Sequence, residues 1–461
     1  MLKKDRFKAM AALILAAGKG TRMRSEKPKV LHELLGRPML WHVRQALAPL
    51  FGDRIHVVIG HGAESVRQAF PEIQDGFIEQ REQLGTGHAL REAWPALARQ
   101  GYAYCLVING DAPLVRTGTL ESFVDASLDM DADIAFLSIR LADPGSYGRV
   151  VRSLDGRGVA IVEAKDHDTA VHGPVTGEIN SGVYFLRMEA VGPLLDSLTN
   201  ENKSGEYYIT DLVGLGAARG LRVVAEDRGE DPGLLGVNSP RELVEAEAML
   251  ARRVADGWLD RGVIVRNPES VRISAEALIG PGTDISGPCE IYGDTVIGEN
   301  AVIASHCHIR DSQLAAGCVI HSFSHLEKAA VGPACAVGPY GRLRPGAVLE
   351  QGAKVGNFVE VKKSTLGQGV KASHLTYIGD ARIGAGTNIG AGTITCNYDG
   401  KSKHPTEIGE NAFIGSNTAL VAPVTVGAGA LVAAGSVITK DVPEGALAVG
   451  RARQTNLERK K

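Results

Sequence analysis

The sequence predicts two domains of different fold class: an α/β domain with a mostly parallel, Rossmann-like sheet, followed by a parallel β-helix. Two observations lead to this prediction. In the first half of the chain, short apolar runs alternate with stretches of helical spacing, and from about residue 262 an aliphatic residue recurs at every sixth position. A length of 461 residues agrees with two or three domains, each able to bury a core.

The first domain is predicted from short continuous apolar runs at residues 11–16, 55–60 and 104–110. Between them, residues 38–50 and 85–98 have the apolar spacing of helices. Strands that alternate with helices in this way form βαβ units and a mostly parallel sheet. We expect this domain to occupy residues 1–238.

The second domain is predicted from a period of six residues. In a β-helix of stacked coils, one aliphatic residue on each short face points inward, which gives a period of six. Neither an α-helix nor a β-hairpin has this period. The step is interrupted twice, and we expect the β-helix to occupy residues 262–461. The residues that keep the step are Ile273, Ile279, Ile285, Ile291, Ile297, Ile303 and Ile309, then Val331, Val337, Leu343, Leu349, Val355 and Val361, and finally Ile408, Ile414, Leu420, Val426, Val432 and Ile438.

A helical linker is expected at residues 239–261. Ser239 is a suitable N-cap, Pro240 suits the first helical position and Glu242 suits the third. Leu243, Leu250 and Val254 then mark one helix face.

Composition restricts the partners and the compartment. The net charge of −3 argues against nucleic acid or an anionic membrane as the partner. Six cysteines without a CxxC pair fit reduced thiols and a cytoplasmic protein. The basic start and short apolar stretch resemble a signal peptide, but Gly18 and Lys19 follow at once and a buried strand explains the stretch equally well. No apolar run approaches the roughly 18 residues of a membrane span, so we expect no membrane insertion.

Phosphate chemistry is predicted in the first domain. The loop LAAGKGTRMRSEKPK, residues 15–29, gathers five cations against one glutamate after a strand. A glycine-rich turn there exposes backbone N–H groups to phosphates, and Lys29 is a suitable point charge; a solvated basic loop is the alternative. Asp111 follows a buried strand and could hold Mg²⁺, with Asn238 as a second oxygen; a turn and a helix cap are the alternatives.

A hairpin around Asp155-Gly156 is predicted from strand-like arms on each side. In a two-residue turn the paired residue numbers sum to 311, so Gly148 would face Glu163 as a clamp on a sugar hydroxyl. A longer turn would break this pairing.

The β-helix has features that a pure scaffold would not need. Arg342, Arg344, Lys362 and Lys363 could hold a sugar phosphate, and residues 395–407 lack the six-residue step and should loop out. His374 is a candidate general base, and a solvated histidine is the alternative. A zinc site is another alternative, because His306, Cys307, His308, Cys318, His321 and His325 lie in one segment and the last three have C-x2-H-x3-H spacing.

The motifs LAAGKGTRM, EQLGTGHA, NGDAPL, EINSGVY and GEYYITD closely resemble those of the sugar-1-phosphate nucleotidyltransferases. With the β-helix, the resemblance extends over almost the whole chain to the bacterial bifunctional N-acetylglucosamine-1-phosphate uridyltransferases and glucosamine-1-phosphate acetyltransferases. It implies a nucleotidyltransferase fold and a left-handed β-helix of hexapeptide repeats. Two local departures are Asn109, where some relatives carry an aromatic residue, and PYGRLRPG, which is more apolar in some relatives.

The resemblance implies acetyl transfer from acetyl-CoA to glucosamine 1-phosphate, then Mg²⁺-dependent transfer from UTP to N-acetylglucosamine 1-phosphate, giving UDP-N-acetylglucosamine for cell-wall and lipopolysaccharide synthesis. It also implies a homotrimer formed through the β-helix. It places the nucleotide at Leu15, Ala16, Gly18, Lys29, Gln80, Gly85 and Thr86, the metal at Asp111 and Asn238, and the sugar of the uridyl site at Gly148, Glu163, Asn180, Tyr208 and Thr210. In the second domain it gives His374 as the base, Arg344, Lys362, Tyr377 and Asn388 as sugar-phosphate ligands, and Ala391, Asn397, Tyr398, Ser416, Ala434 and Arg451 as acetyl-CoA ligands.

Two alternatives remain open at this point. One is a single-activity nucleotidyltransferase whose β-helix only assembles trimers. The other is a non-catalytic regulatory subunit with the same two folds, against which the presence of Lys29, Asp111 and His374 argues.

Overall fold

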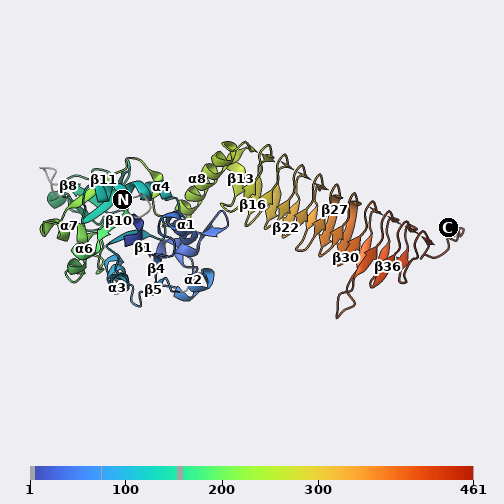
Figure 1. The fold of residues 1–461 in the computed structure, drawn as a ribbon, viewed down its shortest axis with the longest axis horizontal. Coiled ribbons are helices and arrows are strands. Elements are labelled where there is room, and N and C mark those ends of the chain that lie inside the picture. Colours follow the sequence, from blue (N-terminus) through green and yellow to red (C-terminus); the bar gives the residue numbers. More distant parts are fainter. Residues whose placement is uncertain (1–5, 74, 153–158, 460–461) are drawn as a thin grey trace. The chain divides into compact units, whose positions relative to one another are not determined.

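The computed structural model describes residues 6–73, 75–152 and 159–459. Contacts within the chain divide it into two compact units, residues 1–247 and 248–461, and the division falls inside helix α8 (Pro240–Leu259) (Figure 1). The domain boundaries given above, at residues 238 and 262, remain a prediction.

The first unit is built on a twisted sheet with strand order β11-β7-β10-β6-β1-β4-β5. Strands β5, β4, β1 and β6 pair in parallel, β10 runs antiparallel between β6 and β7, and β11 is parallel to β7. The predicted, mostly parallel sheet is therefore confirmed. The strands are β1 Met10–Leu15, β4 Ile55–Ile59, β5 Phe77–Glu79, β6 Tyr104–Asn109, β7 Ile134–Arg140, β10 Glu178–Arg187 and β11 Val223–Asp227, with a small pair β2 Glu33–Leu34 and β3 Arg37–Pro38.

Helices cover both faces of this sheet. Ile14 of β1 packs on the side of α1, and Leu13 packs on the side of α3 in a separate core. Both faces of the strand are thus buried, which explains why its sequence is continuously apolar rather than alternating. The helices are α1 Met39–Phe51, α2 Ala63–Ala69, α3 Thr86–Arg99, α4 Thr117–Asp129, α5 Thr169–His172, α6 Met188–Leu195 and α7 Asp211–Ala218.

The predicted hairpin register is confirmed. Strand β8 (Arg149–Arg152) pairs antiparallel with β9 (Val159–Val162), and Arg149 lies opposite Val162, so the numbers sum to 311. The turn around Asp155-Gly156 lies outside the described residues. A Cβ added at Gly148 would lie 3.4 Å from Glu163 Oε1, so the bare backbone does face the carboxylate.

Helix α8 begins as predicted. Glu242 N–H donates to Ser239 Oγ at 3.3 Å, while the Glu242 carboxylate accepts from Asn238 N–H at 2.6 Å. Across the parts of the chain that the structure describes, no helix combines the length and apolar character needed to span a bilayer.

The second unit is a left-handed parallel β-helix. Inward-facing residues of successive coils pair in one continuous row, from Ile285 through Ile303, Ile320 and Val337 to Val355 and beyond. All the aliphatic residues that keep the six-residue step are buried.

Two of the three faces join in one set of strands, namely β12 Ile264–Arg266, β13 Val271–Ile273, β15 Asp284–Ser286, β16 Cys289–Tyr292, β18 Val302–Ile303, β19 Cys307–Arg310, β21 Val319–Ile320, β22 His325–Glu327, β24 Ala336–Val337, β25 Arg342–Leu343, β27 Lys354–Lys362, β29 Lys371–Gly379, β31 Asn388–Ile389, β32 Ile394–Cys396, β34 Phe413–Ile414, β35 Ala419–Val421, β37 Leu431–Val432, β38 Val437–Ile438 and β39 Leu447–Ala448. The third face holds β14 Leu278–Ile279, β17 Val296–Ile297, β20 Gln313–Leu314, β23 Ala330–Val331, β26 Val348–Leu349, β28 Thr365–Leu366, β30 Ala381–Ile383, β33 Thr406–Ile408 and β36 Val424–Val426.

The stretches that interrupt the step are coils with a shortened edge. Leu314, Ile320 and Leu326 are buried and continue the inward-facing rows. The step from Ile309 to Leu314, however, is five residues long instead of six. Each five-residue step contains a residue with a left-handed backbone, at Asp311, Lys328, Lys363 and Asp380, with φ between 44° and 50°. This conformation lets the chain turn from one face of the β-helix to the next with one residue fewer. We call the edge that holds these four residues the shortened edge.

Candidate active sites

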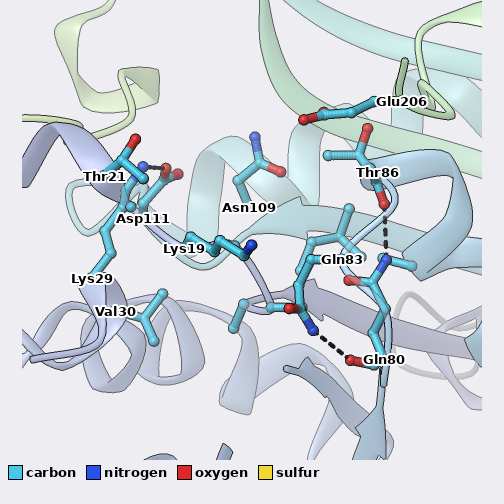
Figure 2. Close-up of a pocket in the computed structure, with 17 residues that line it drawn as sticks. Lys19, Thr21, Lys29, Val30, Gln80, Gln83, Thr86, Asn109, Asp111 and Glu206 are labelled. Carbon is cyan, nitrogen blue, oxygen red and sulfur yellow. Dashed lines mark hydrogen bonds and ion pairs between the residues drawn. The ribbon is translucent and has the colours of Figure 1, made fainter. Parts of the chain in front are cut away.

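A cavity of about 480 Å³ lies at the carboxyl ends of β1 and β6 (Figure 2). Gly85 has φ +111°, and a Cβ there would lie 2.4 Å from the Tyr207 carbonyl oxygen, so only glycine fits. Gln80 Nε2 donates to the Gly85 carbonyl at 3.0 Å and fixes this turn. The cavity is lined by every residue expected to bind the nucleotide: Leu15, Ala16, Gly18, Lys29, Gln80, Gly85 and Thr86.

Lys29 joins the two expected metal ligands. Its ammonium group forms an ion pair with the Asp111 carboxylate and donates to Asn238 Oδ1 at 2.7 Å. Figure 2 shows the Lys29 side chain directed at Asp111, with their ion pair drawn as a dashed line. Gly20, with φ +58°, leaves room for the Lys29 side chain, because a Cβ there would lie 2.6 Å from Lys29 Cβ.

The oxygens of Asp111 and Asn238 suit a divalent cation. Asp111 Oδ1 is buried without a hydrogen-bond partner, which is costly unless a ligand supplies one. Among the described residues, no group of three or more His, Cys, Asp or Glu could hold a metal. Mg²⁺ prefers one or two protein oxygens together with phosphates, and the loop expected to bind phosphate lies beside these two.

A second cavity of about 270 Å³ adjoins the first, and both are lined by Thr86, Asn109 and Asp111. Its wall also includes Asn238 and four of the residues expected to bind the sugar: Gly148, Glu163, Asn180 and Thr210. Tyr208, the fifth, is half-buried and is not part of this wall. The two cavities therefore lie on either side of Asp111, and we call them the nucleotide cavity and the sugar cavity after these expectations.

Hydrogen bonds fix the polar groups of the sugar cavity. Thr210 Oγ1 donates to Glu163 Oε1 at 3.1 Å, and Asn180 Nδ2 donates to the Tyr184 hydroxyl at 2.6 Å. Burial raises the pKa of Glu163, and the hydrogen bond from Thr210 opposes that rise. Asn109 packs against Gly182, and its amide leaves no room for a Cβ at that position, where the φ of +78° also favours glycine.

Sequence reasoning missed Arg22. Its guanidinium donates to Ser146 Oγ at 2.9 Å and to Asn238 Oδ1 at 2.8 Å, and it lines the sugar cavity. The run of cations signalled a binding loop, but nothing in the sequence separates Arg22 from Lys19 or Arg24.

In the second unit, His374 is exposed on β29. Its Nδ1 lies 2.8 Å from Oδ1 of Asn357, its neighbour on the preceding coil. With this oxygen as the acceptor, Nδ1 carries the proton and Nε2 can accept one. Asn357 belongs to no motif, so the sequence could not reveal it.

The expected sugar-phosphate ligands lie on adjacent coils. Arg344 Nη1 donates to Glu360 Oε1 at 2.8 Å, and Glu360 pairs with Tyr377 on the next coil. Lys362 lies opposite Gly379 in the same pairing. Asn388 follows one coil later, opposite Lys371.

Four expected acetyl-CoA ligands, Ala391, Ser416, Ala434 and Arg451, form one exposed or half-exposed row along an edge. Asn417 N–H donates to the Ala391 carbonyl at 2.7 Å, Gly435 N–H donates to that of Ser416 at 2.8 Å, and Arg451 Nη1 donates to that of Ala434 at 2.6 Å. Asn397 and Tyr398 begin an excursion between β32 and β33, residues 397–405, which we call the arm. This is the predicted loop, although Thr395 and Thr406 on either side of it are buried in the coils.

The zinc alternative finds no support. Cys307 and Cys318 are buried inside the β-helix, whereas His325 is exposed and packs against His308 in a tilted arrangement with ring centroids 4.7 Å apart. These side chains diverge and cannot surround one ion.

Fold and sites together define a class of protein: a nucleotidyltransferase joined to a hexapeptide-repeat acyltransferase. The chain matches the MobA-like NTP transferase domain at residues 12–160, the GMPPB C-terminal domain at residues 273–355 and the hexapeptide repeat of succinyl-transferase at residues 405–440. It is 59% identical to the bifunctional protein GlmU of Nitratidesulfovibrio vulgaris strain Miyazaki F, covering 98% of each chain. It is 56% identical to that of Oleidesulfovibrio alaskensis, covering 97% of each, and 47% identical to that of Lawsonia intracellularis, covering 98% of each. The chain belongs to the family of bifunctional GlmU proteins.

The chain is therefore a bifunctional enzyme of UDP-N-acetylglucosamine synthesis. It transfers acetyl from acetyl-CoA to glucosamine 1-phosphate and then uridylyl from UTP to N-acetylglucosamine 1-phosphate, releasing pyrophosphate. A divalent metal belongs to the nucleotidyltransferase reaction in general.

Proposed function

We propose that uridylyl transfer takes place where the two cavities of the first unit meet. The observation that carries this proposal is the shared wall of Thr86, Asn109 and Asp111 between the expected nucleotide pocket and the expected sugar pocket. A phosphate oxygen of the sugar phosphate would attack the α-phosphorus of UTP in this place, and pyrophosphate would leave. The attacking oxygen is already ionised, so no side-chain base is needed.

The side chains at this junction orient the reactants and neutralise charge, which is most of what phosphoryl transfer requires. Lys29 and Arg22 supply positive charge on the nucleotide and sugar sides of Asn238. Asp111 and Asn238 would hold Mg²⁺, which supplies further neutralisation of the phosphates when bound. Gly148, Glu163, Asn180 and Thr210 would orient the sugar; Tyr208 is proposed only through the family resemblance.

Acetyl transfer is assigned to the face around His374. Its Nε2 would take the proton of the glucosamine amine as the nitrogen attacks the thioester carbon, and the thiolate of coenzyme A would leave. Asn357 would hold the imidazole in the required tautomer. Arg344, Lys362, Tyr377 and Asn388 would bind the sugar phosphate, and the row from Ala391 to Arg451, with Asn397 and Tyr398, would bind acetyl-CoA.

A homotrimer formed through the β-helix is part of this proposal. The hexapeptide repeats favour oligomer formation, and His374 stands on an exposed face where a neighbouring copy can add a wall.

Six cysteines without a disulfide support a cytoplasmic location.

Two variants test these assignments in paired assays. We expect Asp111→Ala to lose pyrophosphate release but keep acetyl transfer, measured as thiol release from acetyl-CoA that depends on glucosamine 1-phosphate. We expect His374→Ala to do the reverse. If either variant lost both activities while remaining folded, the two sites would not be independent.

A further inference from the structure

The backbone that carries Asn238, one of the two expected metal ligands, is fixed to its surroundings on both sides. Val237 N–H donates to the Asp111 carbonyl at 2.8 Å. Asn238 N–H donates to Oε2 of Glu242, in the first turn of α8, at 2.6 Å. The first contact joins this backbone to the other expected metal ligand, and the second joins it to a helix.

The side-chain amide of Asn238 has a fixed direction as well. Its Nδ2 donates to the Gly236 carbonyl at 3.3 Å, and its Oδ1 accepts from Lys29 Nζ at 2.7 Å and from Arg22 Nη2 at 2.8 Å. Gly236 also lies against Asp111, because a Cβ there would lie 3.0 Å from Asp111 Oδ1. The position of the amide oxygen beside the Asp111 carboxylate therefore depends on where this backbone is held.

Tyr147 holds the other end of the same segment. Its hydroxyl donates to the Gly236 carbonyl at 3.0 Å, and its side chain lines the sugar cavity. Burial, together with the charges of Glu242 and Asp111, raises the pKa of Tyr147 to about 12, so the hydroxyl keeps its proton and remains a donor. Residues 236–238 are thus suspended between a wall of the sugar cavity and the start of α8.

The contact made by Glu242 differs from that of an ordinary helix cap. In a capping box, the glutamate at the third helical position accepts from the backbone N–H of the N-cap residue, which is Ser239 in α8. Ser239 Oγ does accept from Glu242 N–H, at 3.3 Å, but Glu242 Oε2 reaches one residue further back, to Asn238. A hydrogen bond to a carboxylate is stronger than one to a neutral acceptor. Here it is made with the peptide group of a metal ligand.

We propose that Glu242 is a positioning residue for the metal of uridylyl transfer: by fixing the peptide group of Asn238, it sets where the amide oxygen lies relative to the Asp111 carboxylate. This inference rests on the proposed function, in which Asp111 and Asn238 hold the metal. Glu242 acts through Asn238, as the hydrogen-bond partners of metal ligands do in other proteins. Replacing such partners typically lowers metal affinity or activity about 10- to 100-fold.

The first test measures the Mg²⁺ concentration that gives half-maximal pyrophosphate release by the full-length protein. We expect Glu242→Ala to raise this concentration about tenfold, while the KM for UTP at saturating Mg²⁺ and the rate of acetyl transfer stay within about twofold. Glu242→Gln keeps an oxygen that can accept from Asn238 N–H and should recover most of the loss. Glu245→Ala is the matched control, because it removes the same charge from an exposed position of the same helix and should change none of these values.

Binding of Mn²⁺ provides a readout that does not depend on turnover. Enhancement of water proton relaxation reports the Mn²⁺ bound to the protein, and it can be titrated with UTP present and without the sugar phosphate. The dissociation constant should rise in Glu242→Ala by the same factor as the Mg²⁺ requirement and should be unchanged in Glu245→Ala. Equal Mn²⁺ affinity of the wild type and Glu242→Ala would overturn the inference.

Ser239→Ala separates positioning from the stability of the helix start. It removes the hydroxyl that caps α8, which destabilises the first turn, but it leaves the contact between Glu242 and Asn238 in place. We expect a lower Tm with unchanged Mg²⁺ and Mn²⁺ constants. A Mg²⁺ requirement raised as far as in Glu242→Ala would assign the effect to the helix start and reject the positioning role.

Asn238→Ala distinguishes a failure of this inference from a failure of the proposed metal site. It should weaken Mn²⁺ binding, and the double variant Asn238→Ala/Glu242→Ala should be no worse, since both changes act through one ligand; additive effects would contradict the inference. If Asn238→Ala weakens binding but Glu242→Ala matches Glu245→Ala, the positioning role is wrong and the metal site stands. If neither Asn238→Ala nor Asp111→Ala affects Mn²⁺ binding or pyrophosphate release, the metal site itself is wrong and the inference falls with it.

Discussion

Asp211 opens helix α7 directly after Thr210 of the sugar cavity. Burial, with the charge of Asp166, raises the pKa of its carboxyl group to about 6. In an unfolded chain the same group ionises near pH 3.9. The folded protein therefore keeps a proton on Asp211 in a range where the unfolded chain has lost it.

This difference predicts a pH-dependent free energy of unfolding. The contribution of Asp211 is fully present below about pH 4 and is lost as the pH rises through about 6, because ionisation then occurs in the half-buried folded site. Between pH 4 and pH 8, the Asp211→Asn variant should lose about 1 kcal/mol less free energy of unfolding than the wild type. This figure is smaller than the full pKa difference would give, because part of the side chain is exposed to solvent. Urea unfolding of both proteins between pH 4 and 8 measures it; parallel curves across that range would contradict the assignment.

At the residue scale, the sequence could predict those site residues that follow strands or stand at fixed motif positions. Asp111 comes just after the buried strand β6, whereas Lys29 and Asn238 were predicted from their places in the basic loop and after an apolar run. The structure brings the three side chains together at one edge of the sheet. Arg22 and Asn357 were not predictable, because a cation within a basic run and an isolated amide acquire their roles only from the side chains opposite them.

At the element scale, the shortened edge shows how the β-helix absorbs a missing residue. Asp311, Lys328, Lys363 and Asp380 adopt a left-handed backbone that costs an ordinary side chain roughly 1–2 kcal/mol. In exchange, the inward row continues at Leu314 and its equivalents without a break. The six-residue pattern is interrupted in the sequence at these coils, because one step is five residues long. The next aliphatic side chain nevertheless still points inward.

The backbone of Lys328 gives a stability prediction. Lys328→Val should lower the free energy of unfolding by about 1–2 kcal/mol, because a β-branched residue tolerates φ 46° poorly. Lys328→Gly should be neutral or stabilising. Lys354→Val, at an exposed strand position, is the control and should be neutral. Thermal unfolding of the three variants checks the order; equal stability of the Lys328→Val and Lys328→Gly variants would show that the edge is not strained.

The hairpin β8–β9 was predicted to the residue, since a two-residue turn fixes the pairing of both arms. The pairing brings Gly148 against Glu163, two positions that no local pattern connects. Tyr208 stands in a matching motif and lies outside the cavity wall, so its role stays a prediction.

At the scale of the whole molecule, two kinds of chemistry are carried by two separate folds. The phosphate-binding loop needs the converging ends of parallel strands, whereas the proposed acetyl site needs a long straight surface with regular spacing. The change of sequence period near residue 262 was sufficient to predict this division. The trimer could not be predicted from spacing, because the period that fills the inside of a coil leaves the outside unspecified.

Independent chemistries predict complementation between inactive variants. An equimolar mixture of Asp111→Ala and His374→Ala should convert glucosamine 1-phosphate, acetyl-CoA and UTP into UDP-N-acetylglucosamine, because the intermediate diffuses from one protein to the other. Neither variant alone should do so, and chromatographic detection of the nucleotide sugar measures the result. A mixture that forms N-acetylglucosamine 1-phosphate but no nucleotide sugar would contradict free diffusion.

The arm emerges from the same edge of the β-helix as the shortened positions, one coil after Asp380. One coil thus makes its turn with a single left-handed residue, and the next inserts residues 397–405 at the equivalent place, while Ile383 and Ile408 remain paired inside. The number of residues at this edge can vary freely, because no side chain there fills the interior of the β-helix. New loops, and with them new substrate preferences, can therefore be inserted at this edge without disturbing the coils of the β-helix.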